Sequence, residues 1–579
     1  MAMRSVMQHQ FSQIPRADIP RSSFNRSHGY KTTFDSGYLV PFYVDEALPG
    51  DTFSFHCSLF SRLATPIVPI MDNMFMETFF FAVPIRLIWD NWVRFQGEQR
   101  DPGDSTDFLV PQIKSPPGGW QVGTLSDYFA LPTEVDNLSV SSFWHRAYNL
   151  IYNEWFRDQN LQESLPVPRD DGPDSDDDFK LVRRGKRHDY FTSALPWPQK
   201  GPGIELPLGA TASIGFRDPT MGETTLFVQE NPNHYPRFKN LFYTGTPPIE
   251  NVSSQYFLST SDNSTPNKLI SAFPYPPGSS SASVPLAEGE PLRFAGSWSG
   301  LQARLRQADL NLLQADLSTA IGPTINSLRQ AFQLQKLLER DARGGTRYTE
   351  ILRAHFGVVS PDSRLQRPEY LGGSSTRINV NPVQQTSSTD NVSPQGNLAA
   401  FGVAGDIFHG FTKSFVEHCV LIGLVNVRAD LTYQQGIQRM FSRQTRYDFY
   451  MPVLAHLGEQ EILNKEIYAQ GNSVLNNAGY PVDDEIFGYQ ERWAEYRYFP
   501  SQITGKFRSN YAQSLDVWHL SQKFNNLPKL NAEFIEDNPP IKRVIAVPSE
   551  PEFIFDCYVS LRCARPMPIY SVPGLVDHF

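Results

Sequence analysis

Four segments of the chain show the hydrophobic patterns of β-strands. Between residues 51 and 59 the odd positions from 53 onward are apolar and the even ones polar, and residues 553–563 repeat this alternation, with apolar side chains at every odd position. A period of two places one face of a strand in a core. Residues 74–83 and 419–427 are almost continuously apolar, which predicts strands covered on both faces.

The matching strand patterns near both ends of the chain favour one sheet system with the intervening chain looped out. Two sheets packed with Greek-key connections, a jelly roll, accommodate this order. Long insertions between strands are tolerated because loop-closure entropy grows only logarithmically with length. The predicted fold is therefore mainly β, an eight-stranded antiparallel jelly roll (β-sandwich) with long loop insertions and a few α-helices.

Two segments have helical periodicity. In residues 143–157 apolar side chains recur at spacings of four, three and four, and Ser141 or Ser142 is a suitable N-cap. Residues 323–340 carry a second apolar stripe, which the glycines at 344 and 345 end. Both helices are interpreted as packing elements and not as cofactor sites.

Composition divides the chain into four parts. Residues 1–31 form a polar arm that two prolines keep extended. Residues 201–300 are rich in Pro, Ser, Asn and Gly with few periodic runs, which predicts a variable surface insertion. Residues 32–200 and 301–579 are expected to form the jelly-roll domain on either side of it.

Aromatic residues make up 13% of the chain and charged residues only 19%, against about 25% charged residues in an average soluble protein. Extensive interfaces with partners require this balance, because aromatics are enriched and charges depleted at their centres. A large β core that needs Phe and Tyr explains it equally well. Composition alone leaves both explanations open.

The net charge, the cysteines and the hydropathy further limit the classes of protein to which the chain can belong. The net charge of −10 argues against a generic nucleic-acid coating protein, and the four cysteines contain no CxxC pair. We therefore expect four reduced, buried thiols and no zinc site. No apolar stretch approaches the roughly 20 residues of a membrane span, and the N-terminus has no apolar signal core, so neither membrane insertion nor secretion by a standard signal is expected.

The N-terminal arm is locally basic, since five cations face only one carboxylate, Asp18. A draped or disordered terminus is one interpretation. The interpretation that gives the arm a function is an inward segment that contacts nucleic acid or neighbouring subunits. Its candidate nucleic-acid contacts are Arg4, Arg16, Arg21, Arg26 and Lys31.

Two charge runs are candidates for ligand binding. The acidic run 170–178 fails as a calcium loop because Phe179 and Gly185 stand where such a loop needs Gly and Glu, so we expect a solvated acidic loop. The basic run 183–188 is largely neutralised by this neighbour. An exposed hairpin or intersubunit ion pairing is the favoured interpretation, and phosphate contact the weaker alternative.

Motifs of catalysis are missing from the sequence. Residues 503–507 lack the first Gly and the hydroxyl residue of a phosphate-binding loop, Trp298 occupies the serine position of a would-be nucleophile elbow, and no His-x-His pair exists. No catalytic, cofactor-binding or metal-ligating residue is therefore predicted. The protein is not expected to be an enzyme.

Several motifs spread along the chain carry a family resemblance. They are RAYNLIYNEWFRDQN (146–160), FDSGYLVP (34–41), PGDTF (49–53), MDNMF (71–75), RDARGGTRY (340–348), FGV (356–358) and FGYQERWAEYR (487–497). Together they strongly resemble the major capsid proteins of the Microviridae, and more particularly the gokushovirus branch. Only residues 201–300 carry little of this resemblance.

The resemblance implies a jelly-roll subunit, sixty copies of which form a T=1 icosahedral shell around a circular single-stranded DNA genome. It also implies an internal scaffolding protein, a pilot protein and a small basic DNA-packaging protein as partners. Residues 201–300 would form a protrusion at the threefold axes that meets a host receptor or surface glycan. The protein would be located in the virion and assemble in the cytoplasm of the bacterial host.

The main alternative is a soluble carbohydrate-binding β-sandwich protein. It predicts a compact monomer with an aromatic-lined sugar groove, whereas a capsid subunit should form uniform shells. A hydrolase has no motif behind it.

Overall fold

The computed structural model describes residues 20–204, 324–386, 389 and 395–570, and between 205 and 323 only the backbone of short strands. The chain divides into two compact units, Met1–Gly201 with Leu337–Phe579, and Pro202–Lys336. The predicted insertion 201–300 falls in the second unit, which continues to Lys336.

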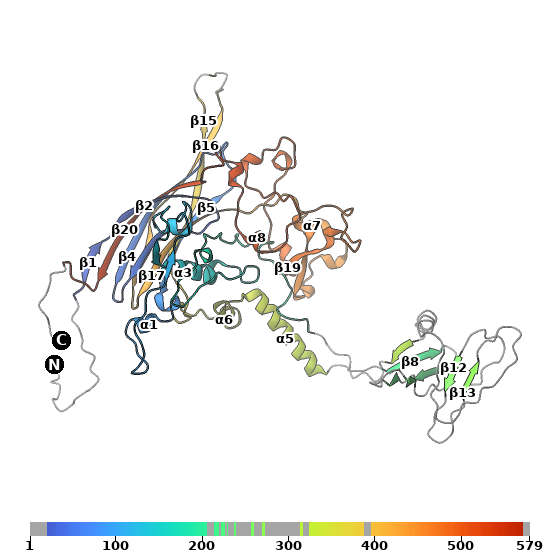
Figure 1. Cartoon of the computed structure of the whole chain (residues 1–579). Coiled ribbons are helices and arrows are strands. Elements are labelled where there is room, and N and C mark those ends of the chain that lie inside the picture. Colours follow the sequence, from blue (N-terminus) through green and yellow to red (C-terminus); the bar gives the residue numbers. More distant parts are fainter. Residues whose placement is uncertain are drawn as a thin grey trace. The chain divides into compact units, whose positions relative to one another are not determined.

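The first unit is built around a nine-stranded antiparallel sheet with the order β1-β20-β4-β16-β15-β5-β17-β3, in which β2 also pairs with β20 (Figure 1). The strands are β1 (Ser22–Asn25), β2 (His28–Phe34), β3 (Val40–Ala47), β4 (Thr52–Leu63), β5 (Met74–Pro84), β15 (Glu369–Gln384), β16 (Leu398–Ser414), β17 (Cys419–Ala429) and β20 (Phe553–Arg565).

These strands fill eight positions, because β1 and β2 lie end to end against β20. Sheet 1 comprises β1 with β2, β20, β4 and β16, and sheet 2 comprises β15, β5, β17 and β3. Numbered along the chain, the eight positions run 1-8-3-6 in sheet 1 and 5-4-7-2 in sheet 2. This interleaving of early and late strands is that of a jelly roll, which confirms the predicted fold.

The four strands predicted from periodicity are β4, β20, β5 and β17. The first two lie side by side, with Cys57 opposite Val559 and Leu59 opposite Cys557. The early and late parts of the chain thus meet in one sheet, as expected. The alternating positions of both strands are buried on the inner face and half-buried or exposed on the outer one.

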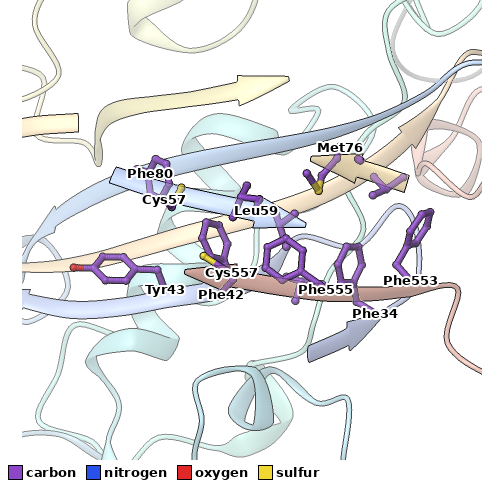
Figure 2. Packing of buried hydrophobic residues seen from close by; sticks show 14 of the residues in the cluster. Phe34, Phe42, Tyr43, Cys57, Leu59, Met76, Phe80, Phe553, Phe555 and Cys557 are labelled. Carbon is purple, nitrogen blue, oxygen red and sulfur yellow. The ribbon is translucent and has the colours of Figure 1, made fainter. Parts of the chain in front are cut away.

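The core between the two sheets is rich in phenylalanine (Figure 2). The Phe55 ring lies 5.1 Å from that of Phe411 and 4.9 Å from that of Phe80, centroid to centroid. Phe34 stacks on Phe553 at 5.6 Å and so joins the first sheet position to the last strand. All four cysteines are buried and free, as predicted.

A second core covers the outer face of sheet 2. The insertion between β5 and β15 places helix α3 (Phe143–Ile151), which a π-helical turn extends to Phe156, against β17. Phe81 of β5 and Ile422 of β17 are buried in this second core, whereas Phe80 and Leu421 point into the first. The continuously apolar strands are therefore covered on both faces, as predicted. Ser142 precedes α3 but makes no capping bond, because its hydroxyl donates to the Pro111 carbonyl (3.3 Å).

Short elements complete the first unit. The β5–β15 insertion also holds α1 (Trp92–Phe95), β6 (Gln112–Lys114), α2 (Leu125–Tyr128), β7 (Ser139–Ser141) and α6 (Tyr348–Phe356). The insertion between β17 and β20 has a third core and holds β18 (Glu459–Leu463), α7 (Asn464–Ile467), β19 (Ile486–Glu491) and α8 (Ala532–Ile535).

The second predicted helix is α5 (Ile325–Gly344), which ends at the expected glycine. The second unit contains the short strands β8 (Ser213–Asp218), β9 (Gly222–Thr225), β10 (Val228–Gln229), β11 (Arg237–Phe238), β12 (Tyr256–Ser259), β13 (Leu269–Ala272) and β14 (Leu313–Asp316). They pair as β14-β8-β9, β10-β11 and β12-β13.

Candidate functional site

The cations predicted to touch nucleic acid have different surroundings. Arg4 and Arg16 lie outside the described residues. Arg21 is exposed and donates to the Thr52 hydroxyl (2.8 Å), and Lys31 forms an exposed ion pair with Asp556 (3.2 Å). Both side chains therefore remain accessible to a ligand.

Arg26 is held differently. Its guanidinium donates to both carboxylate oxygens of Asp45, at 2.7 and 2.9 Å, and Asp45 is nearly buried. Burial lowers the pKa of Arg26, but the contact with Asp45 outweighs it and the pKa is raised. Arg26 is thus engaged within the subunit, at the bend between β1 and β2.

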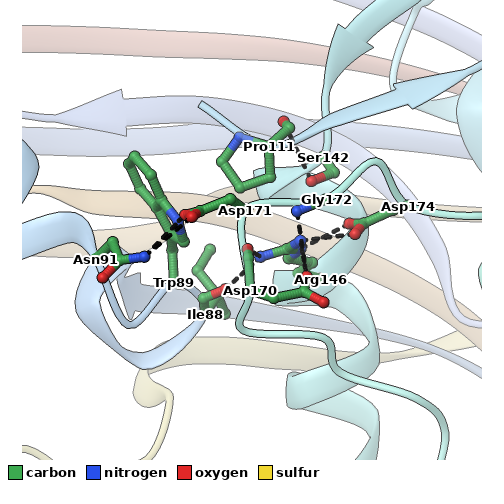
Figure 3. A network of polar contacts seen from close by, with 10 residues as sticks. All are labelled: Ile88, Trp89, Asn91, Pro111, Ser142, Arg146, Asp170, Asp171, Gly172 and Asp174. Atoms are coloured by element: carbon green, nitrogen blue, oxygen red, sulfur yellow. Dashed lines mark hydrogen bonds and ion pairs between the residues drawn. The ribbon is translucent and has the colours of Figure 1, made fainter. Parts of the chain in front are cut away.

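The acidic run 170–178 is a solvated loop only in part. Asp170, Asp171 and Asp177 are exposed, as predicted, but the prediction is wrong for Asp174. Asp174 is buried and accepts two 2.6 Å hydrogen bonds from Arg146 on α3, which is itself fully buried (Figure 3). The Arg146 guanidinium also donates to the Ile88 and Asp170 carbonyls, at 3.0 and 2.9 Å. A buried guanidinium requires this set of acceptors.

Two other carboxylates of the run fix indole rings. Asp171 accepts from Trp89 Nε1 (2.7 Å) and from the Asn91 amide, and Asp176 accepts from Trp120 Nε1 (2.6 Å). Trp89 and Trp120 are both buried. The run therefore holds together the layer that covers sheet 2.

The basic run 183–188 is not an exposed hairpin, because most of its cations are held by contacts within the chain, which corrects that prediction. Ion pairing of its accessible part with another subunit stays a prediction. Arg187 and Arg428 donate to the Glu77 carboxylate at 2.9 and 2.7 Å, and Arg184 also contacts it. Lys186 is buried and donates to the Phe534 carbonyl (2.5 Å). These cations join β5, β17 and the insertions internally.

Burial raises the pKa of the carboxylates in this cluster, and the neighbouring cations lower it. Burial opposes ionisation of Glu77, but Arg184 and Arg428 outweigh it, and the pKa of Glu77 is lowered to about 2. For Asp537 burial wins over Arg428 and Lys186 and raises the pKa to about 7. Neither Asp537 carboxylate oxygen has a hydrogen-bond partner in the described part of the chain.

One buried cluster has the order of a nucleophile, a base and an acid. Cys57 Sγ lies 3.1 Å from His409 Nε2, and His409 Nδ1 lies 3.1 Å from Asp406. A hydrogen bond to Cys557 and burial raise the pKa of the Cys57 thiol, and burial lowers the pKa of His409. A thiol that stays protonated and buried is a poor nucleophile, so this cluster is a polar element of the core.

Within the described residues, no group of His, Cys, Asp or Glu side chains is arranged to hold a metal ion, and no helix is long and apolar enough to cross a membrane. The charged clusters that the structure assembles bind one part of the subunit to another. The class that the fold defines is a jelly-roll β-sandwich with long insertions and interior charge clusters.

Comparison with known proteins identifies the family to which the chain belongs. A family model described as "Capsid protein (F protein)" matches residues 12–575, and the chain belongs to this family. It is 47% identical to Capsid protein VP1 of Bdellovibrio phage phiMH2K over 576 residues and 48% identical to that of Chlamydia phage 1 over 597 residues, covering 99% of this chain and 98% of each relative. Capsid protein VP1 of Spiroplasma virus 4 is 36% identical over 598 residues, with 99% of both chains covered.

These matches confirm the resemblance to the gokushovirus-like Microviridae. The protein is a structural component that assembles with copies of itself into the capsid of the virion, and its family is not one of enzymes. The carbohydrate-binding alternative is not favoured.

Proposed function

We propose that sixty copies of this chain form a T=1 icosahedral shell around a circular single-stranded DNA genome. The observation that carries the proposal is the similarity to viral capsid proteins along the whole chain, on a jelly roll whose core strands include both early and late segments. Each subunit of such a shell contacts several neighbours, so individually modest interfaces add up to a stable particle.

The surface of the β17–β20 insertion supports this assembly. Large apolar side chains are exposed along it, including Phe441, Tyr447, Val453 and Phe499. Burial of exposed apolar side chains favours association between proteins, and aromatics are enriched in such contacts. The proposal assigns these exposed rings to interfaces between subunits, whereas other rings fill the core between the sheets.

Electron microscopy of the purified full-length protein tests the proposal. We expect closed, uniform isometric shells whose mass corresponds to sixty subunits. A persistent monomer under all conditions of concentration and salt would contradict it.

Charge places a requirement on genome packaging. At −10 per chain, sixty copies carry about −600 in formal charge, so net charge cannot neutralise packaged DNA. Local cations must do so, together with a separate basic protein. We assign the inward contacts to Arg4, Arg16 and Arg21 and to Lys31, with Arg26 bound to Asp45 at the base of the arm. Lys31 belongs to β2, so the arm predicted over residues 1–31 gives way to sheet strands from Ser22 onward.

The partners follow from the same proposal. An internal scaffolding protein, a pilot protein and a small basic DNA-packaging protein would act with the shell during assembly in the bacterial cytoplasm. Mass spectrometry of particles purified from infected cells checks for the last two, and of assembly intermediates for the first.

The insertion 201–300 is proposed as the threefold protrusion that meets a host receptor or surface glycan. Its placement within a separate compact unit supports this role, because such a unit can vary without disturbing the jelly roll. Replacing residues 205–316 by a short Gly-Ser linker should spare assembly and abolish adsorption to the host. Unchanged adsorption would remove the receptor role.

A further inference from the structure

The two outer faces of the jelly roll differ in what lies on them. The insertion between β5 and β15 covers sheet 2. On sheet 1 the outward residues of β2, β20 and β4 are exposed or half-buried. We call the outward side of sheet 1 the open sheet face.

Three aromatic rings stand on the open sheet face. Tyr558 of β20 is 57% exposed and Phe60 of β4 is 49% exposed. Phe408 of β16 is 75% exposed, at a β-bulge between Asp406 and His409. The bulge lies opposite the segment of β4 around Ser58, so Phe408 stands near the row that contains Tyr558.

The neighbours of these rings are small. Tyr558 pairs with Gly29 on one side and with Ser58 on the other. Phe60 pairs with Gly405 on one side and with Asp556 on the other. Residues directly opposite each other on a sheet point to the same side, and short side chains there leave the faces of the rings free.

The backbone at Phe408 has an unusual conformation. Its φ is +61°, in the left-handed region that bulky side chains rarely adopt. Strain of this kind persists where the surrounding structure enforces it, and it is concentrated at functional positions. Here the bulge turns His409 inward to Cys57 and Thr78 and places Phe408 outside.

Four cations lie on the same sheet face as the rings. Arg62 pairs with Ile554 and Arg562 pairs with Ser54 across β4 and β20, so both arginines lie on the open sheet face. Neither makes an ion pair with another described residue. Lys31, opposite Asp556, and Arg21, which reaches Thr52, add two more.

The open sheet face is therefore basic in an acidic protein. Asp556 is the carboxylate among its outward residues, so four cations and one anion give a local charge of +3, whereas the whole chain carries −10. Proteins that bind single-stranded nucleic acid without sequence preference combine aromatic platforms for bases with cations along the backbone.

The geometry points to the open sheet face as the surface that binds single-stranded DNA inside the shell, with bases stacked on Tyr558, Phe60 and Phe408 and phosphates held by Arg62, Arg562, Lys31 and Arg21. This inference rests on the proposed function and names the surface that performs it. Stacking on rings tolerates any base, which suits a shell that must enclose a whole genome.

Photo-crosslinking of intact particles tests the location. Ultraviolet irradiation followed by mass spectrometry should find nucleotide adducts on the peptides that contain Tyr558 and Phe60. Adducts found only elsewhere overturn the inference but leave the proposed function intact. Particles without DNA overturn both, and protein crosslinks from this face to another chain identify a protein-binding surface instead.

Binding of an oligothymidylate of about 16 nucleotides to the full-length unassembled chain tests the chemistry. Tyr558→Ser and Phe60→Ser should each weaken binding by roughly five-fold to over one hundred-fold, and Tyr558→Phe should retain it. Arg62→Gln with Arg562→Gln should reduce the slope of log K against log salt by about 0.7 for each lost phosphate contact.

The matched control is Tyr348→Ser, which removes an exposed ring from α6 and should leave oligonucleotide binding unchanged. All variants should keep the wild-type unfolding midpoint, which separates lost binding from lost folding. Wild-type affinity in Tyr558→Ser and Phe60→Ser, or equal loss in Tyr348→Ser, would refute the inference.

Discussion

The outer faces of sheets 1 and 2 are built from strands of the same fold but are used differently. On sheet 2, Phe81 and Ile422 are sealed beneath α3, and the Glu77 carboxylate is surrounded by arginines. On sheet 1, Tyr558 and Phe60 are exposed. One face supports the subunit, and the other remains available for a ligand.

This difference shows that the same residue types have different energetic roles on the two faces. A ring on the covered face stabilises the fold by leaving water, whereas a ring on the open sheet face contributes little until it meets a partner. An ion pair follows the same rule, since screening weakens it at the surface and its loss is costly in the interior. Paired substitutions on the two faces measure the contrast.

The largest effect is expected from a ring of the covered face. Phe81→Ala removes a buried side chain between β5 and the insertion and should lower the free energy of unfolding by about 4 kcal/mol. Phe60→Ala on the open sheet face is the control and should change it by less than about 0.5 kcal/mol. Urea unfolding of the unassembled chain measures both. Equal effects would mean that sheet 1 is also covered.

The next largest difference in stability between the two faces is expected when a carboxylate is removed from each. Glu77→Gln leaves Arg184 and Arg428 without their anion and should destabilise the fold by about 3 kcal/mol at neutral pH, whereas Asp556→Asn, which breaks the exposed pair with Lys31, should cost at most about 1 kcal/mol.

The contribution of Glu77 to the stability of the fold should decrease as the pH falls. Because the pKa of Glu77 falls from 4.5 to about 2 on folding, its contribution is full above the unfolded pKa and is lost as the pH falls toward 2. Unfolding of the wild type between pH 6 and pH 2 should show this loss, and the Glu77→Gln profile should be flatter. Parallel profiles would contradict the role of Glu77.

A third, opposite effect is expected from Asp537. Its pKa rises from 3.8 to about 7 on folding, so the folded state holds the proton more tightly and stability falls as the pH rises from about 4 to about 7. Asp537→Asn should remove this decline and stabilise the subunit by about 1–3 kcal/mol at pH 8. Urea midpoints at pH 5 and pH 8 check it, and a loss of stability at pH 8 would contradict it.

The smallest effect on stability is expected on the open sheet face itself. Tyr558→Ser should shift the free energy of unfolding by less than about 0.5 kcal/mol, because the ring is exposed. The same variant should assemble shells with a reduced DNA content, read from the ratio of absorbance at 260 and 280 nm. A large loss of stability would place Tyr558 in the core and not at an interface with DNA.

Much of the fold was predictable from local pattern. Strict alternation in β4 and β20 indicated strands with one buried face, and the continuous apolar runs of β5 and β17 indicated strands covered twice. The physical reason is that a period of two follows directly from strand geometry. Helix α3 was predictable in the same way, although the role of Ser142 was not.

The charge clusters were not predictable. The basic run 183–188 looked like a surface patch, but Arg184 meets Glu77 across 107 residues and Arg428 meets it across 351. The buried pair of Arg146 and Asp174 corrects the solvated-loop interpretation in the same manner. Such pairings carry no periodic signal, because each depends on where the folded chain brings two distant segments together.

The sequence by itself determined the strands, the jelly roll and the family, because hydrophobic periodicity and shared motifs are local properties of the chain. Only the tertiary structure decided which sheet face is covered and which cations remain unpaired. Arg62, Arg562 and Tyr558 are separate in the sequence, and it is the register of β20 on β4 that brings them onto one surface.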